Sequence, residues 1–323
     1  MTMRVVIPDQ LTRIITPVSP LAAEADRQAV AWAEDHRLVT TPAGWDRLAA
    51  TRPGTLAAHC YPSASQDDLF LLADWMTWLF SLDDQNDEGS YGRNPEALER
   101  ALTSVFFTAV NRHGPVTNDP LAAALTNVFN RIDDRMSVGW RRRFMHHVFD
   151  YLTANVWQAA HRRTDDIPDL DTFPGMRRNT GAIIPSFDLI EFVESTTIPA
   201  ELYYSRVYQR LMTSAANVVC WTNDLMTLEK ELAHDDKHNF VPVLGHALSI
   251  SLEDSIDEVA ARAGREVELF LAAEGELDRV FDTLRVSEDL RAAALGCVGM
   301  LRAWMRGHVE WGRSTARYVE ATL

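Results

Sequence analysis

The apolar segment LFLLADWMTWLFSL, residues 69–82, constrains the fold more than any other stretch of the 323-residue chain. If this segment is helical, large apolar side chains cover every face of the helix, so no polar face is left for water. The segment contains Asp74 and is too short to cross a bilayer. It therefore predicts a helix that is buried inside a protein domain.

Apolar side chains elsewhere in the chain also recur at the period of a helix. Within residues 120–160, 202–232 and 290–318 they return every three or four positions. With 15 Gly and 14 Pro, turns are few, and no linker or internal repeat divides the chain. We expect an all-α protein whose residues 1–323 form a single domain, with loops near residues 89–95, 165–174 and 234–239.

The composition excludes several classes of function. The chain has 31 Lys and Arg against 46 Asp and Glu, a formal net charge of −15, which disfavours binding to nucleic acid. Cys60, Cys220 and Cys297 lie far apart without a CxxC pair, and the first residues lack the apolar core of a signal peptide. We expect a cytoplasmic protein that does not enter the membrane, and the sequence leaves monomer and homodimer open.

An acidic run, DDQNDE at residues 83–88, directly follows the apolar segment. If the helix continues, Asp83 and Asp87 lie one turn apart on one face, so their carboxylates can bind the same cation or adjacent ones. The carboxylates repel one another and lie at the negative end of the helix dipole, so a positive partner is expected. A solvated helix end is the alternative interpretation.

Two other acidic runs look similar but carry a weaker signal. The second DDxxD pattern, at residues 165–169, contains Pro168, which breaks a helix, so we interpret it as a loop. The DDKHN run at residues 235–239 lies in a polar connection. We interpret its acids, Asp235 and Asp236, as solvated.

A second constellation of oxygen donors lies in the segment CWTNDLMTLEKEL. Asn223, Thr227 and Glu231 are spaced four residues apart, so they follow one stripe of a helix. Amide, hydroxyl and carboxylate oxygens favour magnesium over zinc. Lys230 adds a donor for an anion beside such a metal. The alternative is an ordinary polar helix face.

These motifs together resemble the class I terpene synthases of the bacterial type. DDQND at residue 83 is followed about 140 residues later by NDLMTLEKE, which matches that family's second metal motif. MRRNTG at residues 176–181 is similar to its diphosphate-sensing segment. ARY at residues 316–318, preceded by WMRGHVEW at 304–311, is similar to its C-terminal Arg-Tyr pair.

The resemblance implies a bundle of helices around a deep apolar cavity, with both metal motifs at its mouth. Three Mg²⁺ ions would bind the diphosphate of a prenyl substrate there. The implied metal ligands are Asp83, Asp84, Asp87, Asn223, Thr227 and Glu231. The implied donors to the diphosphate are Arg177, Lys230, Arg317 and Tyr318.

The sensing segment holds two adjacent arginines. The family places its sensor arginine 46 residues before the asparagine of the second metal motif, which selects Arg177. Thr180 and Gly181 then match the positions of its linker and effector residues, and the Gly181 carbonyl would point into the cavity at a helix break. Arg178 is expected to be a surface ion-pair residue, although a gap of one residue would exchange the two arginines.

Aromatic faces can stabilise a carbocation without attacking it. Phe80 and Trp304 match positions that face the cavity in the family, and we expect them to take part in catalysis. With 9 Trp and 13 Phe in the chain, most other aromatic side chains, such as Trp75, are expected to fill the core. His308 stands where the family often has asparagine.

The function that the resemblance implies is the magnesium-dependent cyclisation of farnesyl diphosphate to a sesquiterpene. A diterpene synthase that uses geranylgeranyl diphosphate is the first alternative. A chain-elongating prenyl diphosphate synthase would need two helical DDxxD motifs, and the second copy here contains Pro168. A non-catalytic helical scaffold would leave Arg177, Lys230 and Arg317 without a role.

Overall fold

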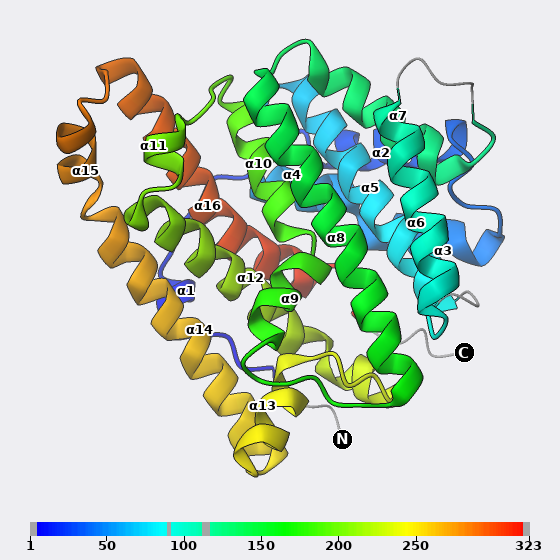
Figure 1. The fold of residues 1–323 in the computed structure, drawn as a ribbon. Helices are drawn as coiled ribbons and strands as arrows, with labels where there is room; N and C mark the ends of the chain where they lie inside the picture. Colours follow the sequence, from blue (N-terminus) through cyan, green and yellow to red (C-terminus); the bar gives the residue numbers. More distant parts are fainter. Residues whose placement is uncertain (1–4, 89–91, 112–116, 319–323) are drawn as a thin grey trace.

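The computed structural model of the chain describes residues 5–88, 92–111 and 117–318, with their side chains except at 86–88. The described residues form helices and no strand, which confirms the all-α prediction (Figure 1). The helices are α1 (Asp9–Thr12), α2 (Ala22–Asp35), α3 (Pro42–Thr51), α4 (Pro53–Cys60), α5 (Gln66–Glu88), α6 (Pro95–Val110), α7 (Pro120–Asp133), α8 (Val138–Thr164), α9 (Phe173–Thr180), α10 (Ile183–Val193), α11 (Ala200–Tyr203), α12 (Arg206–Ala233), α13 (Phe240–Leu248), α14 (Leu252–Glu274), α15 (Leu277–Leu284) and α16 (Glu288–Ser314).

Several prolines begin helices instead of breaking them. α3, α4, α6 and α7 each start at a proline, a position where the missing N–H costs no hydrogen bond. The residues just before two of these prolines, Asn94 and Asp119, accept hydrogen bonds from backbone N–H groups of the first turn. The sparse prolines of the sequence therefore mark where helices start.

Helix α5 is buried, as its apolar composition predicts. Leu69, Trp75 and Trp78 have no exposed surface, and α5 packs against α2, α4 and α7. Phe80 is only half-buried. α5 continues through the acidic run to Glu88, so the backbone places residues 83 and 87 one turn apart.

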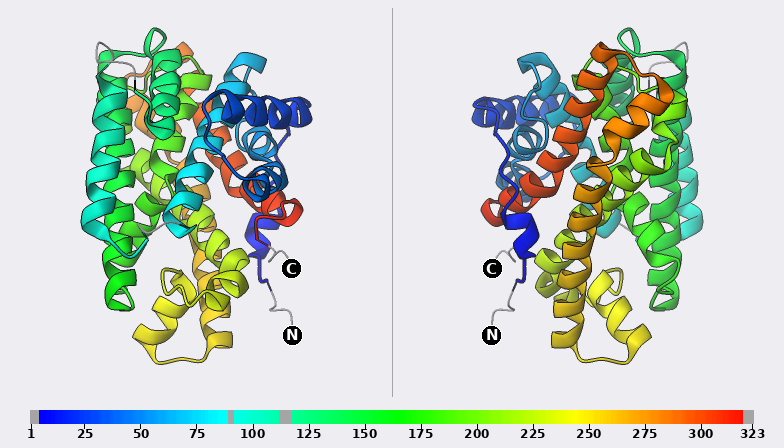
Figure 2. Two further views of the ribbon diagram at one scale, coloured as in Figure 1. Left: turned by 90° about the vertical axis from the view of Figure 1, so that its right-hand side faces the viewer. Right: turned by 90° about the vertical axis from the view of Figure 1, so that its left-hand side faces the viewer.

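α10 packs against α8, α12 and α16. α12 packs against both α14 and α16, α4 packs against α5 and α16, and α6 packs against α7 and α8. In Figure 1, α14 and α6 lie near opposite edges of the molecule, and α10 and α16 lie between them. Figure 2 shows the same helices from the two sides. No helix among the described residues is long and apolar enough to span a membrane.

The structure differs from two of the predicted boundaries. The periodic stretch 120–160 is two helices, because α7 ends at Asp133 and Ser137 caps a new helix, α8. The stretch 290–318 was expected to be helical to its end, but α16 ends at Ser314 and Thr315 is extended. The Arg-Tyr pair at 317–318 therefore lies beyond the helix.

The predicted connections are present where the structure describes them. The second DDxxD pattern lies between α8 and α9, as expected from Pro168. The DDKHN run connects α12 to α13, but the prediction that Asp236 is solvated is wrong. Asp236 is partly buried and pairs with Arg162 of α8 at 2.5 Å. Burial acts to raise its pKa, but the hydrogen bonds from His238 and the charge of Arg162 together lower it.

Candidate active site

The acidic end of α5 meets the C-terminal segment that follows α16. Arg317 donates to Asp83 at 2.6 Å and to Asp84 at 3.0 Å. Burial alone would lower the pKa of Arg317, but the two carboxylates outweigh burial and raise it. Asp87 lies in α5, and its side chain is outside the described part of the chain. Arg317 thus supplies the positive charge that the sequence predicted for this cluster.

The polar face of α12 is built as its four-residue spacing predicts. Thr227 donates its hydroxyl to the carbonyl oxygen of Asn223, one turn earlier, at 3.0 Å. Glu231 accepts a hydrogen bond from the Asn239 amide at 2.8 Å. Burial, and after it the nearby charge of Asp224, raises the pKa of Glu231 to about 7. Both effects disfavour the ionised carboxylate, and a bound cation would favour it.

A chain of hydrogen bonds crosses the site through Asn223. Arg177 donates to the Asn223 amide oxygen at 2.7 Å, and the Asn223 amide nitrogen donates to the Tyr318 hydroxyl at 2.7 Å. A guanidinium can only donate, so the amide oxygen must face Arg177 and the nitrogen must face Tyr318. This chain brings together the sensing segment, the second metal motif and the C-terminal pair.

His308 lies at the end of this chain of hydrogen bonds. Its Nε2 atom is 3.3 Å from the Tyr318 hydroxyl and 3.5 Å from the Asn223 amide nitrogen. Burial, with a smaller contribution from Arg177, lowers the pKa of His308 to about 3, so the ring is neutral at physiological pH. A neutral ring can accept a hydrogen bond from the Tyr318 hydroxyl at Nε2. The hydrogen bonds then run in one direction, from Arg177 through Asn223 and Tyr318 to His308.

The two adjacent arginines of the sensing segment have different partners. Both side chains are partly buried, but Arg177 also donates to Asp224 at 2.8 Å, whereas Arg178 donates to the Asn217 side-chain oxygen at 2.8 Å. Only Arg177 contacts the second metal motif. The expectation that Arg178 forms a surface ion pair is corrected, because its hydrogen-bond partner in the structure is an amide.

A helix break follows the sensing segment, as expected. α9 ends at Thr180, Ala182 has a left-handed backbone with φ 51°, and α10 starts at Ile183. The residue four positions after Gly181 is Pro185, which has no N–H to donate to the Gly181 carbonyl. The break and this proline together keep the Gly181 carbonyl out of the helical hydrogen-bond ladder. Thr180 donates to the Arg177 carbonyl at 3.3 Å.

Replacing Gly181 with alanine is expected to lower kcat by about 10–100-fold without unfolding the protein. An added Cβ would lie 3.0 Å from the Arg177 Nη1 atom and 3.3 Å from Ile183, so the guanidinium would have to move. Steady-state kinetics and circular dichroism would test this prediction.

Gly175→Ala is the matched control for that variant. Gly175 lies in α9, the helix that Gly181 directly follows, and the nearest atom to its added Cβ is the end of the Arg178 side chain at 3.9 Å. Its activity should stay within about twofold of the wild type, because no group has to move. Equal losses in the two variants would mean that Gly181 has no special relation to Arg177.

Lys230 and Phe80 lie at the edge of the site. Lys230 is half-buried, and its ammonium has no hydrogen-bond or ion-pair partner among the described residues. Phe80 stacks on Trp311 with ring centres 5.7 Å apart, and the Arg317 guanidinium lies 4.5 Å above its ring. Phe80 therefore packs beneath the arginine that contacts Asp83.

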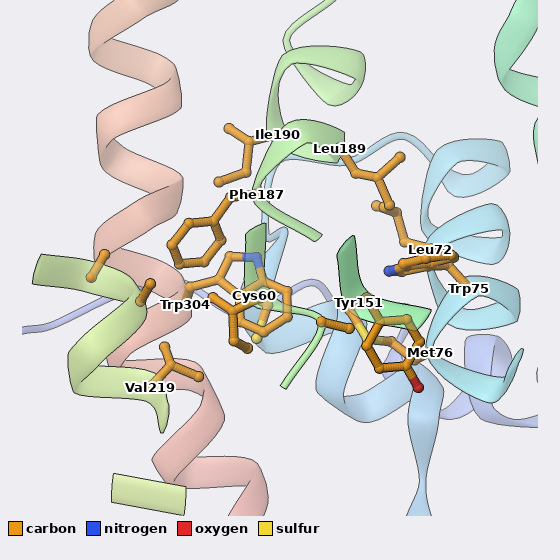
Figure 3. Packing of buried hydrophobic residues seen from close by; sticks show 14 of the residues in the cluster. Cys60, Leu72, Trp75, Met76, Tyr151, Phe187, Leu189, Ile190, Val219 and Trp304 are labelled. Carbon is orange, nitrogen blue, oxygen red and sulfur yellow. The ribbon is translucent and has the colours of Figure 1, made fainter. Parts of the chain in front are cut away.

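Apolar side chains lie deeper along the same helices. Val219 is one turn before Asn223, Trp304 is one turn before His308, and Met76 is two turns before Asp83 and Asp84. In Figure 3, the Trp304 ring of α16 lies beside the Phe187 ring of α10, and their centres are 5.6 Å apart. A layer of aromatic and aliphatic groups thus lies directly behind the polar residues.

A cavity lined in large part by charged side chains lies at the N-terminal end of α5. It has a volume of about 410 Å³ and is lined by α5 residues such as Asp67 and Asp68 and by Arg131 and Arg135. Both arginines already pair with carboxylates of α5. Its lining includes none of the predicted site residues, so it is not the predicted reaction cavity.

Two residues that support the site were missed in the sequence. Asp224 accepts from Arg177 and from the Phe240 backbone N–H, and Asn239 donates both to the Asp224 carbonyl and to Glu231. Both side chains are fully buried. Asp224 directly follows Asn223 in the second metal motif, so the motif could have indicated it. No sequence pattern indicates Asn239, because the run DDKHN resembles a solvated loop.

The residues brought together fit a hard cation. Their candidate ligands are all oxygens, which Mg²⁺ prefers. Among the described residues, no three His, Cys, Asp or Glu side chains gather at one such site. α12 offers one carboxylate with an amide and a hydroxyl, and the third acid of the α5 motif, Asp87, has no described side chain. Burial and the charge of Asp224 raise the pKa of Glu231, and a cation bound at its carboxylate would offset both effects.

Comparisons with known proteins agree with this site. A family model described as terpene synthase family 2, C-terminal metal binding, matches residues 74–268. The chain is 40% identical to (-)-delta-cadinene synthase of Streptomyces clavuligerus, over 96% of this chain and 94% of that protein. It is 32% identical to (+)-T-muurolol synthase ((2E,6E)-farnesyl diphosphate cyclizing) of Roseiflexus castenholzii, with the same coverage of 96% and 94%.

A solved structure shows the same fold. The crystal structure of germacradien-4-ol synthase from Streptomyces citricolor aligns with a TM-score of 0.81 and 25% identity, covering 93% of this chain and 96% of that one. The fold, the paired motifs and these matches lead to one family. The chain is a member of the terpene synthase family, as its motifs predicted.

Proposed function

We propose that this protein cyclises farnesyl diphosphate to a sesquiterpene and releases diphosphate. The observation that carries the proposal is the C-terminal pair, Arg317 and Tyr318, which joins the two motifs. Arg317 contacts the acids of α5, and Tyr318 contacts Asn223 of α12. The relative whose name specifies cyclisation of farnesyl diphosphate supports the choice of substrate.

The proposed metal is magnesium, bound as three ions. When bound, it would neutralise the departing diphosphate and so allow the bond to the allylic carbon to break. The oxygen-only donor set and the partly buried Glu231 carboxylate, which the Asn239 amide holds, support this assignment. The proposed ligands are Asp83, Asp84 and Asp87 of α5, and Asn223, Thr227 and Glu231 of α12.

Four side chains are proposed to donate to the diphosphate oxygens. Arg177, Arg317 and Tyr318 are held in place by the hydrogen bonds described above, and Lys230 has an ammonium that no described residue engages. Donors that are fixed before the reaction lose little energy to reorganisation when charge develops on the leaving group. The convergence of Arg177, Arg317 and Tyr318 on the two motifs supports ionisation without any acid that protonates the substrate.

The apolar layer behind these donors is proposed to receive the carbocation. Excluding water from this layer prevents quenching of the cation. The face of Trp304 is proposed to stabilise it, at about 1–2 kcal/mol. Phe80 is proposed to contribute from the rim of the layer, with the part of its ring that Trp311 and the Arg317 guanidinium leave uncovered. The free carbonyl of Gly181 would present the negative end of its dipole to the same cation. We propose that residues 1–323 carry out this chemistry as one domain.

The proposal is tested by incubating the protein with Mg²⁺ and the C10, C15, C20 or C25 prenyl diphosphate, each in a separate reaction. Mass spectrometry of the volatile products should find a sesquiterpene from the C15 substrate. A diterpene from the C20 substrate alone would replace the proposed substrate. A longer diphosphate formed with added isopentenyl diphosphate would indicate chain elongation, and no product from any substrate would refute the proposal.

A further inference from the structure

The chain leaves the helical conformation at the end of α16, just before its C-terminal pair, Arg317 and Tyr318. α16 ends at Ser314, and Thr315 is extended, with φ −84° and ψ 147°. Within three residues of this point, Arg317 contacts α5 and Tyr318 contacts α12. These residues lie outside any helix, so helical hydrogen bonds cannot hold them. Other contacts must fix the direction of the segment Thr315–Tyr318.

The hydroxyl of Thr315 makes contacts that fix this direction. Its Oγ1 atom lies 3.1 Å from the Ala50 carbonyl and 3.0 Å from the Thr51 carbonyl, both at the end of α3. The same Oγ1 accepts the backbone N–H of Arg317 at 3.2 Å. Thr315 is 5% exposed, so water competes little for these hydrogen bonds. One hydroxyl thus links the end of α3 to the residue that contacts Asp83.

The backbone carbonyl groups at the end of α3 are available to accept hydrogen bonds from other parts of the chain. α3 ends at Thr51, Arg52 is left-handed with φ 56°, and Pro53 starts α4. The last carbonyls of a helix lack partners within it, and a proline adds no donor. The Thr55 N–H, four residues after Thr51, donates to Asp26 instead at 2.8 Å. We call residues 50–53 the α3–α4 corner.

Two further hydrogen bonds tie the C-terminal region to the α3–α4 corner. The indole N–H of Trp311 donates to the Thr51 carbonyl at 2.8 Å, and the Ala316 N–H donates to the Ala50 carbonyl at 3.3 Å. Trp311 also packs edge-on against the Tyr318 ring, with ring centres 5.3 Å apart. The corner therefore anchors the chain just before the C-terminal pair.

We propose that Thr315 is a positioning residue that fixes the C-terminal pair by binding the α3–α4 corner. Its hydroxyl donates to the corner and accepts from Arg317, and no apolar side chain can do both. Without this hydroxyl, the segment Thr315–Tyr318 is no longer held in one conformation. Arg317 and Tyr318 then contact Asp83 and Asn223 in a smaller fraction of the molecules. The inference rests on the proposed function, in which this pair binds diphosphate.

The test compares Thr315→Val, which keeps the shape, with Thr315→Ser, which keeps the hydroxyl. Thr315→Val should weaken the binding of inorganic diphosphate in the presence of Mg²⁺ by about tenfold, measured by calorimetry. It should also raise KM for the prenyl substrate and lower kcat. Thr315→Ser should stay within about threefold of the wild type in all three. Unchanged diphosphate binding in Thr315→Val, with a lower melting temperature alone, would overturn the inference.

A second comparison asks whether Thr315 acts through the C-terminal pair. In a background of Arg317→Ala and Tyr318→Phe, Thr315→Val should have little further effect, because the groups that it positions are gone. An undiminished loss in that background would overturn the inference. Thr283→Val, which removes an exposed helical hydroxyl, is the control and should not change diphosphate binding.

Hydrogen exchange in the metal-free protein gives a readout that does not depend on the reaction. The amide of Arg317 should exchange faster in Thr315→Val than in the wild type, because its acceptor, the Thr315 hydroxyl, is lost. The amide of Ala316 keeps its acceptor, the Ala50 carbonyl, but should also exchange faster, because the Thr315 hydroxyl no longer holds the segment against the α3–α4 corner. Equal exchange would overturn the inference even if the wild type is active. If the wild type neither binds diphosphate nor turns over any prenyl substrate, the proposed function fails, and the positioning role fails with it.

Discussion

Replacing Arg177 with alanine is expected to lower kcat by about 10²–10³-fold, the usual cost of removing one fixed donor to a developing anion. The variant also removes a donor to Asn223 and leaves Asp224, which is fully buried, without its cation. Burial already raises the pKa of Asp224 with Arg177 present. Steady-state kinetics with the accepted prenyl diphosphate would measure the loss.

Two further variants separate chemistry from folding. Arg177→Lys keeps a cation beside Asp224 but lacks the planar fork that also reaches Asn223, so it should fold well and still lose most activity. Arg178→Ala is the matched control, because Arg178 donates to Asn217 and makes no contact with the second motif. It should retain activity within about tenfold of the wild type. A larger loss in Arg178→Ala than in Arg177→Ala would exchange their roles.

The helix content and the burial of α5 could be predicted from the sequence because both depend on local pattern. The all-round apolar segment, residues 69–82, can be stable only when it is buried, and α5 is buried. The spacing of Asn223, Thr227 and Glu231 fixes their common face once the segment is helical. The choice of Arg177 over Arg178 as the proposed sensor needed the family pattern, since nothing local distinguishes the two arginines.

Contacts between distant segments could not be predicted, because they depend on how helices pack. The acidic run of α5 is partnered by Arg317, more than 200 residues later. The end of α16 was missed because residues 290–318 stay apolar at the helical period, while Thr315 gains partners on α3 only in the folded chain. Asp236 was misread for the same reason, since its partner Arg162 belongs to another helix.

A buried ion-pair cluster joins α8 to α10, away from the polar residues of the site. Arg143 of α8 donates to Asp188 at 3.1 Å and also donates to Glu191, and its guanidinium lies 4.0 Å above the Tyr203 ring. Asp188 has no exposed surface, and Glu191 is 3% exposed. His147 contacts the other oxygen of Asp188 at 2.6 Å. One arginine therefore compensates two buried acids.

Arg143→Ala is expected to destabilise the protein by about 3–5 kcal/mol, because it leaves both acids without their cation. For a chain of this length, that corresponds to a melting temperature about 5–7 °C lower in scanning calorimetry. Arg142→Ala is the control, since Arg142 is exposed, and it should change stability by less than about 0.5 kcal/mol. A melting temperature of Arg143→Ala equal to that of the control would show that the two acids do not need Arg143.

The deficit of Arg143→Ala should grow as the pH rises. Burial raises the pKa of Glu191 from 4.5 to about 7 in the wild type, although Arg143 acts to lower it. Without Arg143 the pKa rises further, so folding takes up a proton over a wider pH range. Stability from such a group is present below its unfolded pKa and is lost as the pH rises through its folded pKa. Chemical denaturation of both proteins at pH 5 and pH 8 should therefore give the larger difference at pH 8, and a larger difference at pH 5 would contradict the assignment.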